Sequence, residues 1–423
     1  MRVVHVSYSV EGGAGRAALR LHQNLRDLGT DSLIFAFDEG TTLPPSFHSG
    51  PLDKFLARYM RNIDKLPNKW QRRRVTTNWS NNWAPNLTLR KITELKPDIV
   101  HLHFIGAGTF PIHDFKLVQC PIVWTLHDML AFTGGCHYTG GCQRFLEKCG
   151  RCPALRSSSE DDLSRTNWMR KKEGWANVDL TLVSPSNWLA YEARRSSLMT
   201  DQKVMVIPYG IDLKCFSFMD KLKARKMLGL PSDKFVVAFG AASLKDSRKG
   251  LDLLWEALQD FNERVGQGNC ELLVFGAGGW NPLGSSIPIC NVGMIRDDRK
   301  LALLYSATDV FCAPSREENL ANTALESLAC GTPVLAFRIG GFPDIIDHRQ
   351  TGYLAAPFDV KSLADGLEFL YSSHLVGEDF RAACRDRAER LYDGRTNANR
   401  YIELYDTLIS SWAHRTVTPL ARR

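Results

Sequence analysis

The sequence predicts an α/β protein of two doubly wound domains, and three observations indicate this fold class. Short apolar runs alternate with helical stretches along the chain, which is typical of parallel strands buried on both faces. This alternation of strands and helices is interrupted near Pro208 and Gly210 and then begins again. At 423 residues, the chain is longer than one domain usually runs.

The first half contains the elements of one such domain. A glycine-rich turn, "EGGAG" at residues 11–15, leads from a strand into a helix over residues 16–29. The expected strands are 3–9, 98–104, 121–127 and 180–186. We assign residues 1–207 to this first domain.

The second half repeats the pattern. Its expected strands are 234–242, 270–278, 290–295, 309–315 and 333–337, and helices are expected over 250–261 and 321–330. Gly331 suits the end of the latter helix, with Pro333 just beyond. We assign residues 208–395 to the second domain, and we expect residues 396–423 to form a helix and tail that pack back on the first.

Basic residues gather in one segment of the chain. The net charge is +7, and residues 51–90 alone carry nine Lys or Arg against two Asp. Aromatic side chains lie between these charges, namely Phe55, Tyr59, Trp70, Trp79 and Trp83. This mixture suits a surface that contacts anionic headgroups or phosphates, and it equally suits a solvated helix face with a few packed aromatic residues.

The hydrophobic pattern bears on where the protein works. No apolar run approaches the roughly 20 residues that a transmembrane helix needs, and the opening residues alternate like a strand instead of forming a signal peptide. We therefore expect a cytoplasmic protein that can bind peripherally to the inner face of the cytoplasmic membrane.

Two glutamates, Glu318 and Glu326, lie eight positions apart in "SREENLANTALESLACGTPVLAF", residues 315–337. The stretch runs from a strand end through a loop into a helix whose N-terminus opens at the carboxyl end of the sheet, where doubly wound folds bind ligands and N–H groups bind phosphate. A carboxylate does not suit a diphosphate, but it accepts hydrogen bonds from the hydroxyls that a nucleotide sugar carries on both sides of its diphosphate. The pattern favours a nucleotide-sugar site.

The same stretch resembles the E-x7-E signature of the retaining glycosyltransferases of family four, including bacterial enzymes of exopolysaccharide and colanic-acid type. Further segments occur in the family's order: "GGAG", "DIVHLH", "TLHD", "VSPSNWL", "VIPYGID", "RKGLDLL" and "LYSATDVFCAPS". The resemblance covers nearly the whole chain. It implies the GT-B fold, in which a Rossmann-like acceptor-binding domain and a Rossmann-like nucleotide-sugar-binding domain face a central cleft.

The resemblance also implies roles for the residues around the two glutamates. Glu318 would contact the donor sugar and Glu326 the ribose, although a glutamate at such a helix position is often simply exposed. The backbone N–H groups offered to the sugar and diphosphate would be those of Asn319, Leu320 and Ala321. Ile295 would line the base pocket.

In the first domain, the resemblance assigns the glycine-rich turn and one histidine to the site. Gly12 and Gly13 would let the turn approach the diphosphate and acceptor, unless they serve a plain tight turn. His127 would hydrogen-bond the transferred sugar or orient the acceptor hydroxyl, with Asp128 orienting it in turn; a structural role is the alternative. His103 we expect to be a packing residue.

A basic pair would neutralise the departing diphosphate. Lys249 matches the family's lysine, but Ala241 and Ala242 stand where the family's arginine is usual. We expect Arg248, or else Lys245, to supply the second charge. The resemblance favours a front-face retaining mechanism without a covalent intermediate, and the sequence contains no D-x-D, so we expect neither a catalytic cofactor nor a need for Mg²⁺ or Mn²⁺.

Three functions remain open. The first is transfer of a sugar from a UDP- or GDP-sugar to a saccharide or lipid-linked acceptor in surface polysaccharide synthesis, at an anionic membrane. The second is epimerisation or hydrolysis of a nucleotide sugar on the same fold. The third is a non-catalytic protein that binds membranes or nucleic acid, and the two glutamates and Lys249 argue against it.

Eleven cysteines in a cytosolic chain indicate reduced thiols, and four of them lie close together in the loop 134–153. The four are Cys136, Cys142, Cys149 and Cys152. Four thiols ending in C-x2-C suit a structural zinc ion that takes no part in the reaction. An iron–sulfur cluster, a pair of disulfides, and His137 in place of one cysteine are the alternatives.

Overall fold

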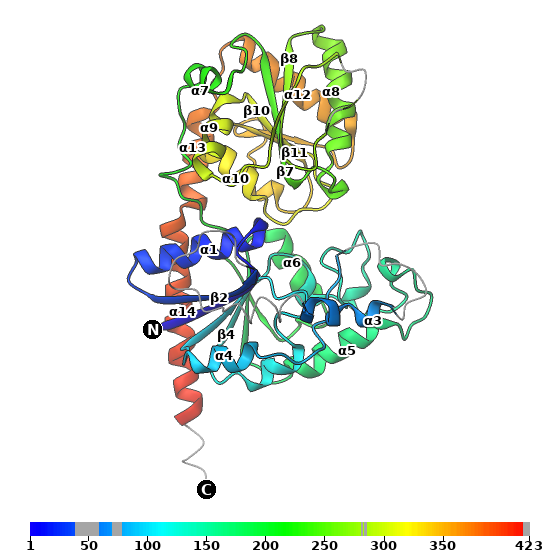
Figure 1. Ribbon diagram of the computed structural model, residues 1–423, viewed down its shortest axis with the longest axis vertical. Helices are drawn as coiled ribbons and strands as arrows, with labels where there is room; N and C mark the ends of the chain where they lie inside the picture. The colour runs from blue at the N-terminus through cyan, green and yellow to red at the C-terminus, as the bar shows by residue number, and fades with distance from the viewer. Residues whose placement is uncertain (39–58, 70–77, 281, 283–285, 418–423) are drawn as a thin grey trace. The chain divides into compact units, whose positions relative to one another are not determined.

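The computed structural model describes residues 1–38, 59–69, 78–280, 282 and 286–417. Its contacts divide the chain into two compact units. Unit 1 contains residues 1–208 and 395–423, and unit 2 contains residues 209–394. Each unit is built around one sheet of six parallel strands with helices on both faces (Figure 1), so the predicted α/β class with two doubly wound units is confirmed.

The sheet of unit 1 has the strand order β2-β1-β3-β4-β5-β6. Most residues of the central strands are fully buried, because helices cover both faces of the sheet. The strands are β1 (Arg2–Ser9), β2 (Asp31–Asp38), β3 (Ile99–Leu102), β4 (Ile122–Thr125), β5 (Leu180–Ser184) and β6 (Lys203–Val206). The helices are α1 (Gly12–Asp27), α3 (Leu66–Lys69), α4 (Thr88–Glu94), α5 (Leu163–Trp175), α6 (Asn187–Arg195) and α14 (Gly394–Val417), with 3₁₀ turns η1 (Ile112–Leu117), η2 (Leu130–Phe132), η3 (Arg144–Leu146) and η4 (Pro153–Leu155).

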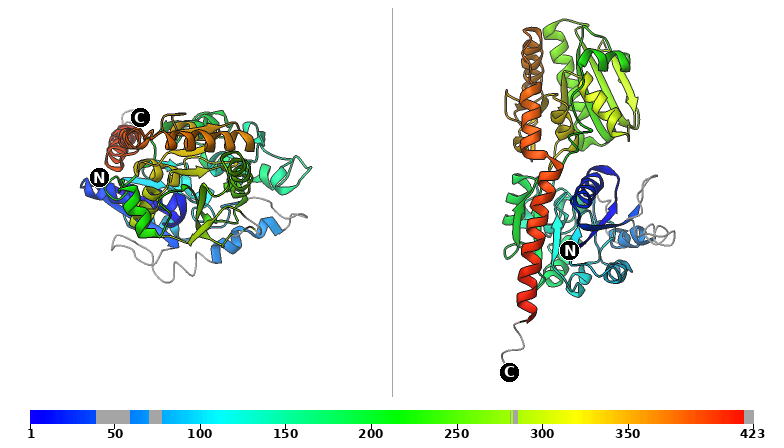
Figure 2. Two further views of the ribbon diagram at one scale, coloured as in Figure 1. Left: turned by 90° about the horizontal axis from the view of Figure 1, so that it is seen from above. Right: turned by 90° about the vertical axis from the view of Figure 1, so that its left-hand side faces the viewer.

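Helix α14 belongs to the core of unit 1 and lies along that unit (Figure 2). Its buried side chains form one apolar cluster with residues from β1, β3, β4 and β5. The α14 members of the cluster are Ala398, Tyr401, Leu404, Tyr405 and Leu408. Two of their hydroxyls enter the sheet, since Tyr401 bonds Thr125 (2.9 Å) and Tyr405 bonds His101 (2.7 Å).

The sheet of unit 2 has the order β12-β11-β10-β7-β8-β9. Its strands are β7 (Phe235–Ser243), β8 (Cys270–Ala277), β9 (Ile289–Gly293), β10 (Val310–Ala313), β11 (Val334–Phe337) and β12 (Gly352–Ala355). Its helices are α7 (Lys221–Leu228), α8 (Leu251–Val265), α9 (Asp298–Ala307), α10 (Asn322–Ala329), α11 (Phe342–Ile345), α12 (Val360–Leu375) and α13 (Arg381–Tyr392), with the 3₁₀ turn η5 (Ser247–Lys249). Buried Asp309 fixes the start of β10, because it accepts bonds from Arg225 (2.5 Å) and from the N–H of Val236 (2.7 Å).

The basic segment 51–90 is described only in part, and most of its charges lie outside the described residues. Of its tryptophans, Trp79 is buried and donates to Asn81 (2.8 Å), and half-buried Trp83 donates to the carbonyl of Ile63 (3.1 Å). Buried Trp79 fits the alternative of a packed aromatic residue, and contact of the segment with a membrane stays a prediction. No helix in the described part of the chain is long and apolar enough to span a bilayer.

Candidate active site

The strand order of unit 2 reverses between β7 and β10, and ligands of doubly wound sheets bind outside the carboxyl ends of the strands at such a point. The loop after β7 carries Arg248 and Lys249, and the loop after β10 carries Glu318. These three residues, predicted from separate motifs, are therefore brought together at the switch point.

The two loops are joined through their backbones. The N–H of Arg316 donates to the carbonyl of Arg248 (2.7 Å), and the guanidinium of Arg248 donates to the carbonyl of Glu317 (2.8 Å). Gly250 has φ +72°, and a Cβ there would lie 2.0 Å from the carbonyl oxygen of Pro314. Only glycine lets the loops approach this closely.

Gly340 makes a similar contact from the loop after β11. A Cβ on Gly340 would lie 1.9 Å from the carbonyl oxygen of Glu318. Neither Gly250 nor Gly340 was expected to matter, because nothing in the sequence marks which glycines face a neighbouring carbonyl. Together they fix the backbone on both sides of Glu318.

The carboxylate of Glu318 is buried and paired with two cations. Its Oε2 lies 2.5 Å from Nζ of Lys249 and 3.6 Å from Nη1 of Arg248. Burial alone would raise the pKa of Glu318, but Lys249 and Arg248 reverse the effect and hold the pKa below its usual value. Glu318 is therefore ionised at neutral pH. Lys245 is exposed and lies against Gly278, so Arg248 occupies the position expected for the second cation.

Helix α10 begins beside Glu318. Asn319, Leu320 and Ala321 are buried, and Ala321 caps the helix without a side-chain hydrogen bond. The capping residue thus has no side chain that accepts from the first N–H groups of α10, which suits the expected anion site. Glu326 is 1% exposed and accepts a bond from the hydroxyl of Tyr305 (3.1 Å), so it is not an ordinary exposed helix carboxylate.

Ile295 lies half-buried in the loop after β9, at the same carboxyl edge of the sheet of unit 2. Its place is compatible with the base pocket that the sequence predicts. The contact of Glu326 with ribose and that of Ile295 with the base remain predictions.

In unit 1, the strand order reverses between β1 and β3. The glycine-rich turn follows β1, and Gly12 has φ +71° where α1 begins. Gly12 thus needs its conformational freedom, and Gly13 follows it in the first turn of α1. The glycine that packs closely against the backbone of this turn is Gly15, where a Cβ would lie 2.4 Å from the carbonyl carbon of Val10.

His127 follows β4 and lines a small pocket together with His103, Trp124 and Asp128. Burial lowers the pKa of His127 to about 4, against a smaller opposing effect of Asp128. The imidazole is therefore neutral at pH 7. The expected support by Asp128 needs correction, because the Asp128 carboxylate accepts hydrogen bonds from His137 Nδ1 (2.6 Å) and from the N–H of Leu130 (2.8 Å).

The ring that holds His127 is His103, which was expected only to pack. His103 Nδ1 lies 3.2 Å from His127 Nε2, and His103 Nε2 lies 2.9 Å from His5 Nδ1. Burial also lowers the pKa of His5 and of His103, so both rings are neutral. The sequence signal for these rings was the H-x-H at residues 101–103, because β1 pairs with β3 and sets His5 opposite His101.

The direction of the hydrogen bonds along His5, His103 and His127 follows from the His5 end of the series. His5 Nε2 is buried and has no hydrogen-bond partner within the described part of the protein. A buried N–H without an acceptor is rarer in proteins than a buried lone pair without a donor, so the proton of His5 is on Nδ1. His5 then donates to His103, and His103 donates to His127 Nε2. The proton of His127 is therefore on Nδ1.

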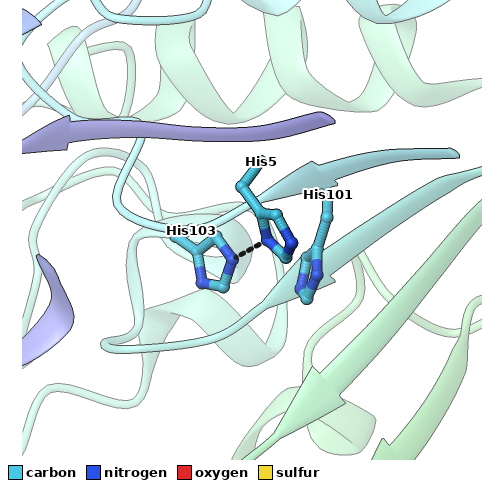
Figure 3. Close-up of side chains that lie close together, drawn as sticks. All are labelled: His5, His101 and His103. Carbon is cyan, nitrogen blue, oxygen red and sulfur yellow. Dashed lines mark hydrogen bonds between the residues drawn. The ribbon is translucent and has the colours of Figure 1, made fainter. Parts of the chain in front are cut away.

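Ring nitrogens of His5, His101 and His103 lie within 4.8 Å of one another (Figure 3), a spacing that would also suit a metal ion. The hydrogen bonds argue against one. Both nitrogens of His101 are bonded, to Tyr405 (2.7 Å) and Thr125 (2.8 Å), and both nitrogens of His103 are bonded to histidines. A metal would have to displace these bonds, so the trio is a hydrogen-bonded network.

Comparison with known proteins shows which family this chain resembles. Residues 11–214 match the model of the family described as "Glycosyltransferase Family 4", and residues 234–373 match "Glycosyl transferases group 1". A D-inositol 3-phosphate glycosyltransferase of Saccharomonospora viridis is 31% identical over 60% of this chain and 61% of its own length. A phosphatidyl-myo-inositol mannosyltransferase of Mycobacterium leprae is 25% identical over 74% of each chain.

Solved structures agree in fold. The sucrose-phosphate synthase of Thermosynechococcus elongatus superimposes with a TM-score of 0.69 at 19% identity, over 97% of this chain and 100% of its own. Anabaena HepE, solved with UDP-glucose, gives a TM-score of 0.65 at 18% identity, over 96% of this chain and 100% of its own. Among the curated relatives, the matched part spans 42% of the Actinosynnema mirum D-inositol 3-phosphate glycosyltransferase and 61% of the Saccharomonospora protein.

The ion pairs of Glu318 predict a pH-dependent stability. Because the folded pKa lies below the unfolded value of 4.5, the ionised carboxylate stabilises the fold above that pH, and this contribution is lost as the pH falls through the folded pKa. The difference in free energy of unfolding between wild type and Glu318→Gln, from urea titrations, should shrink below pH 4.5. Glu368→Gln, at a half-exposed carboxylate of the same unit, is the control. A difference that grows on acidification would contradict the pairing.

The histidine chain predicts the tautomer of His127. In ¹⁵N-histidine-labelled protein, long-range ¹H–¹⁵N correlation spectra should show His127 protonated on Nδ1. His103→Leu removes the donor to Nε2 and should move the proton of His127 toward that nitrogen. A wild-type His127 protonated on Nε2 would overturn the assigned direction of the chain.

Proposed function

We propose a glycosyl-transfer function for this chain, which belongs to glycosyltransferase family 4 and has the GT-B fold. It transfers a sugar from a UDP- or GDP-sugar, with retention of configuration, to a saccharide or lipid-linked acceptor in surface polysaccharide synthesis. The observation that carries the proposal is the buried Glu318 carboxylate with Lys249 and Arg248 around it, at the switch point of unit 2.

The donor site follows from charge. A diphosphate beside Lys249 and Arg248 shares the two cations with Glu318, and the N-terminus of α10 adds N–H groups for its oxygens. As the bond to the sugar breaks, negative charge grows on the diphosphate and the two cations stabilise it. The fold of known structures solved with UDP and UDP-glucose supports a nucleotide donor of this kind.

Glu318 acts on the other product of that bond breaking. Positive charge grows on the sugar ring, and an ionised carboxylate held in a buried position stabilises it without the cost of reorganising water. Glu318 also accepts hydrogen bonds from sugar hydroxyls. It forms no covalent intermediate in this scheme, because the leaving phosphate oxygen takes the proton of the acceptor hydroxyl on the same face.

His127 contributes as a neutral donor. The contact of Nε2 with His103 sets the tautomer of the ring, and in the proposed mechanism His127 orients an oxygen of the transferred sugar or of the acceptor. A neutral ring donates without adding a positive charge near the developing cation. The basic segment 51–90 supports an acceptor at an anionic membrane, since each Lys or Arg near such a surface is worth about 1 kcal/mol.

The first test is transfer itself. Wild type is assayed with UDP- and GDP-sugars, with lipid-linked and water-soluble acceptors side by side, with and without EDTA. We expect transfer to the lipid-linked class that survives EDTA, and we expect Glu318→Gln to lower kcat by about 10²–10³ because the charge that stabilises the cationic sugar is lost. Glu317→Gln, at the neighbouring position, should retain most of the activity.

Near-normal transfer by a folded Glu318→Gln protein would remove Glu318 from the mechanism. An altered or free sugar formed without any acceptor would replace transfer by epimerisation or hydrolysis. Binding of nucleic acid without turnover would favour the non-catalytic reading, and transfer only to soluble saccharides would refute the membrane acceptor.

The second test separates donor binding from catalysis. Lys249→Ala and Arg248→Ala should each weaken UDP or GDP binding by about 10- to 100-fold in calorimetric titrations, as expected for a lost charge-assisted hydrogen bond. Lys245→Ala is the matched control, because Lys245 lies on the same loop as Arg248 but is exposed and lies against Gly278. Unchanged affinity in Arg248→Ala would show that Arg248 does not replace the family's arginine.

A further inference from the structure

The four clustered cysteines, which the proposed function does not use, line a single cavity in unit 1. Cys136, Cys142, Cys149 and Cys152 all contribute to its wall, together with Trp79 and Phe145 among others. The sequence placed these residues in one loop, and the fold turns their side chains toward one space. All four are free thiols, and Cys149 and Cys152 are buried.

The backbone around the cavity has little regular structure of its own. Between β4 and α5 the chain forms only the short turns η2, η3 and η4. Three consecutive residues, Cys149, Gly150 and Arg151, have φ of 55°, 95° and 40°. Left-handed non-glycine residues cost roughly 1 kcal/mol each and persist where surrounding contacts over-determine them. The tight turn formed by these three residues leads directly from Cys149 to Cys152.

A buried cation lies beside these thiols. Lys171 of α5 is 2% exposed, and its ammonium donates to the carbonyls of Leu130 and Thr133 (2.8 Å to the latter). It has no salt bridge among the described residues, but the Asp128 carboxylate is near enough to stabilise its charge. Ionised Cys136 and Cys149 would stabilise it as well. A buried cation favours negative charge around it, so this lysine would stabilise thiolates in the cavity.

We propose that the cavity binds a structural Zn²⁺ ion through the four cysteine thiolates. Binding releases four protons as the thiols ionise, and a Zn²⁺ with four thiolates carries a net charge of −2 by valence. That anion adds to the negative charge that Asp128 already places near Lys171. Two disulfides are neutral and would add none, which is why the charge favours metal over oxidation.

The sulfur atoms do not yet stand at ligand distances. Among the described residues, three or more potential ligand atoms lie within 4.8 Å of one another at His5, His101 and His103, and not at the four cysteines. A tetrahedral zinc site needs sulfurs about 3.8 Å apart, from Zn–S bonds of about 2.3 Å. Rotation of one cysteine about χ1 moves its sulfur by about 3 Å, so the thiols can close around an ion from the walls of the cavity.

His137 is not the fourth ligand. Its ring is bonded to Asp128 (2.6 Å) and to Ser80 (2.9 Å), and the ring does not line the cavity. His137 links the loop 134–153 to the candidate active site instead, since its partner Asp128 lines the same pocket as His127. The ion would therefore hold the loop 134–153 in place, and with it His137, which bonds the Asp128 that lines the pocket of His127.

The test measures metal and needs no substrate. Full-length protein purified without chelator should contain about one zinc per chain by elemental analysis, and Cys149→Ser with Cys152→Ser should contain none. Cys120→Ser, at a buried free cysteine of the same unit outside the loop, is the matched control and should keep its zinc. Metal-free protein with four titratable thiols, two disulfides by mass spectrometry, or iron in place of zinc would each overturn the proposal.

Two further variants guard against simple misfolding. Cys142→His keeps a zinc-binding set of three cysteines and one histidine and should retain the ion. Lys171→Met leaves all four ligands in place and should weaken zinc binding about 10- to 100-fold in chelator competition, the range for groups around a metal site. Unchanged zinc affinity in Lys171→Met would refute the role given to the buried charge. These readouts do not depend on whether the enzyme transfers a sugar.

Discussion

The buried carboxylate of Glu318 is the constraint on which the arrangement of unit 2 depends. A carboxylate that is 7% exposed must be paired, because an isolated buried charge would shift its pKa and lose its ionisation. Its partners come from the loop after β7, so that loop must reach the loop after β10. The strand order makes these two strands neighbours, and Gly250 and Gly340 remove the side chains that would keep the backbones apart.

The same charges explain why two glutamates in one motif behave differently. Glu318 lies in a loop where two cations converge, so it is ionised, and a second anion bound as proposed would share those cations with it. Glu326 lies one turn into α10 and accepts a hydrogen bond from a tyrosine hydroxyl, which is a neutral partner. One position is suited to a changing charge during reaction, and the other to a fixed hydrogen bond.

Much of this could be predicted from the sequence because it is local. The strands follow from apolar runs, and α10 spans Asn322–Ala329, within one residue at each end of the expected helix. Contacts between distant segments could not be predicted in the same way. The choice of Arg248 over Lys245 depends on which side chain turns toward Glu318, and the partner of Asp128 proved to be His137. The sequence also left open whether Trp79 faces a surface or packs inside, and its ring is buried.

The two units hold their functional side chains by opposite means. Unit 2 uses paired charges, and a diphosphate bound as proposed would redistribute contacts that already exist. Unit 1 holds His127 with neutral rings buried in the sheet, where a proton can shift between nitrogens only if the whole chain of bonds reverses. Reversal would place an N–H on the unpartnered side of His5, so burial at one end of the chain fixes the donor at the other. For the sugar-orienting role proposed for His127, such a neutral network suits the ring better than a carboxylate, which would draw a second proton onto it.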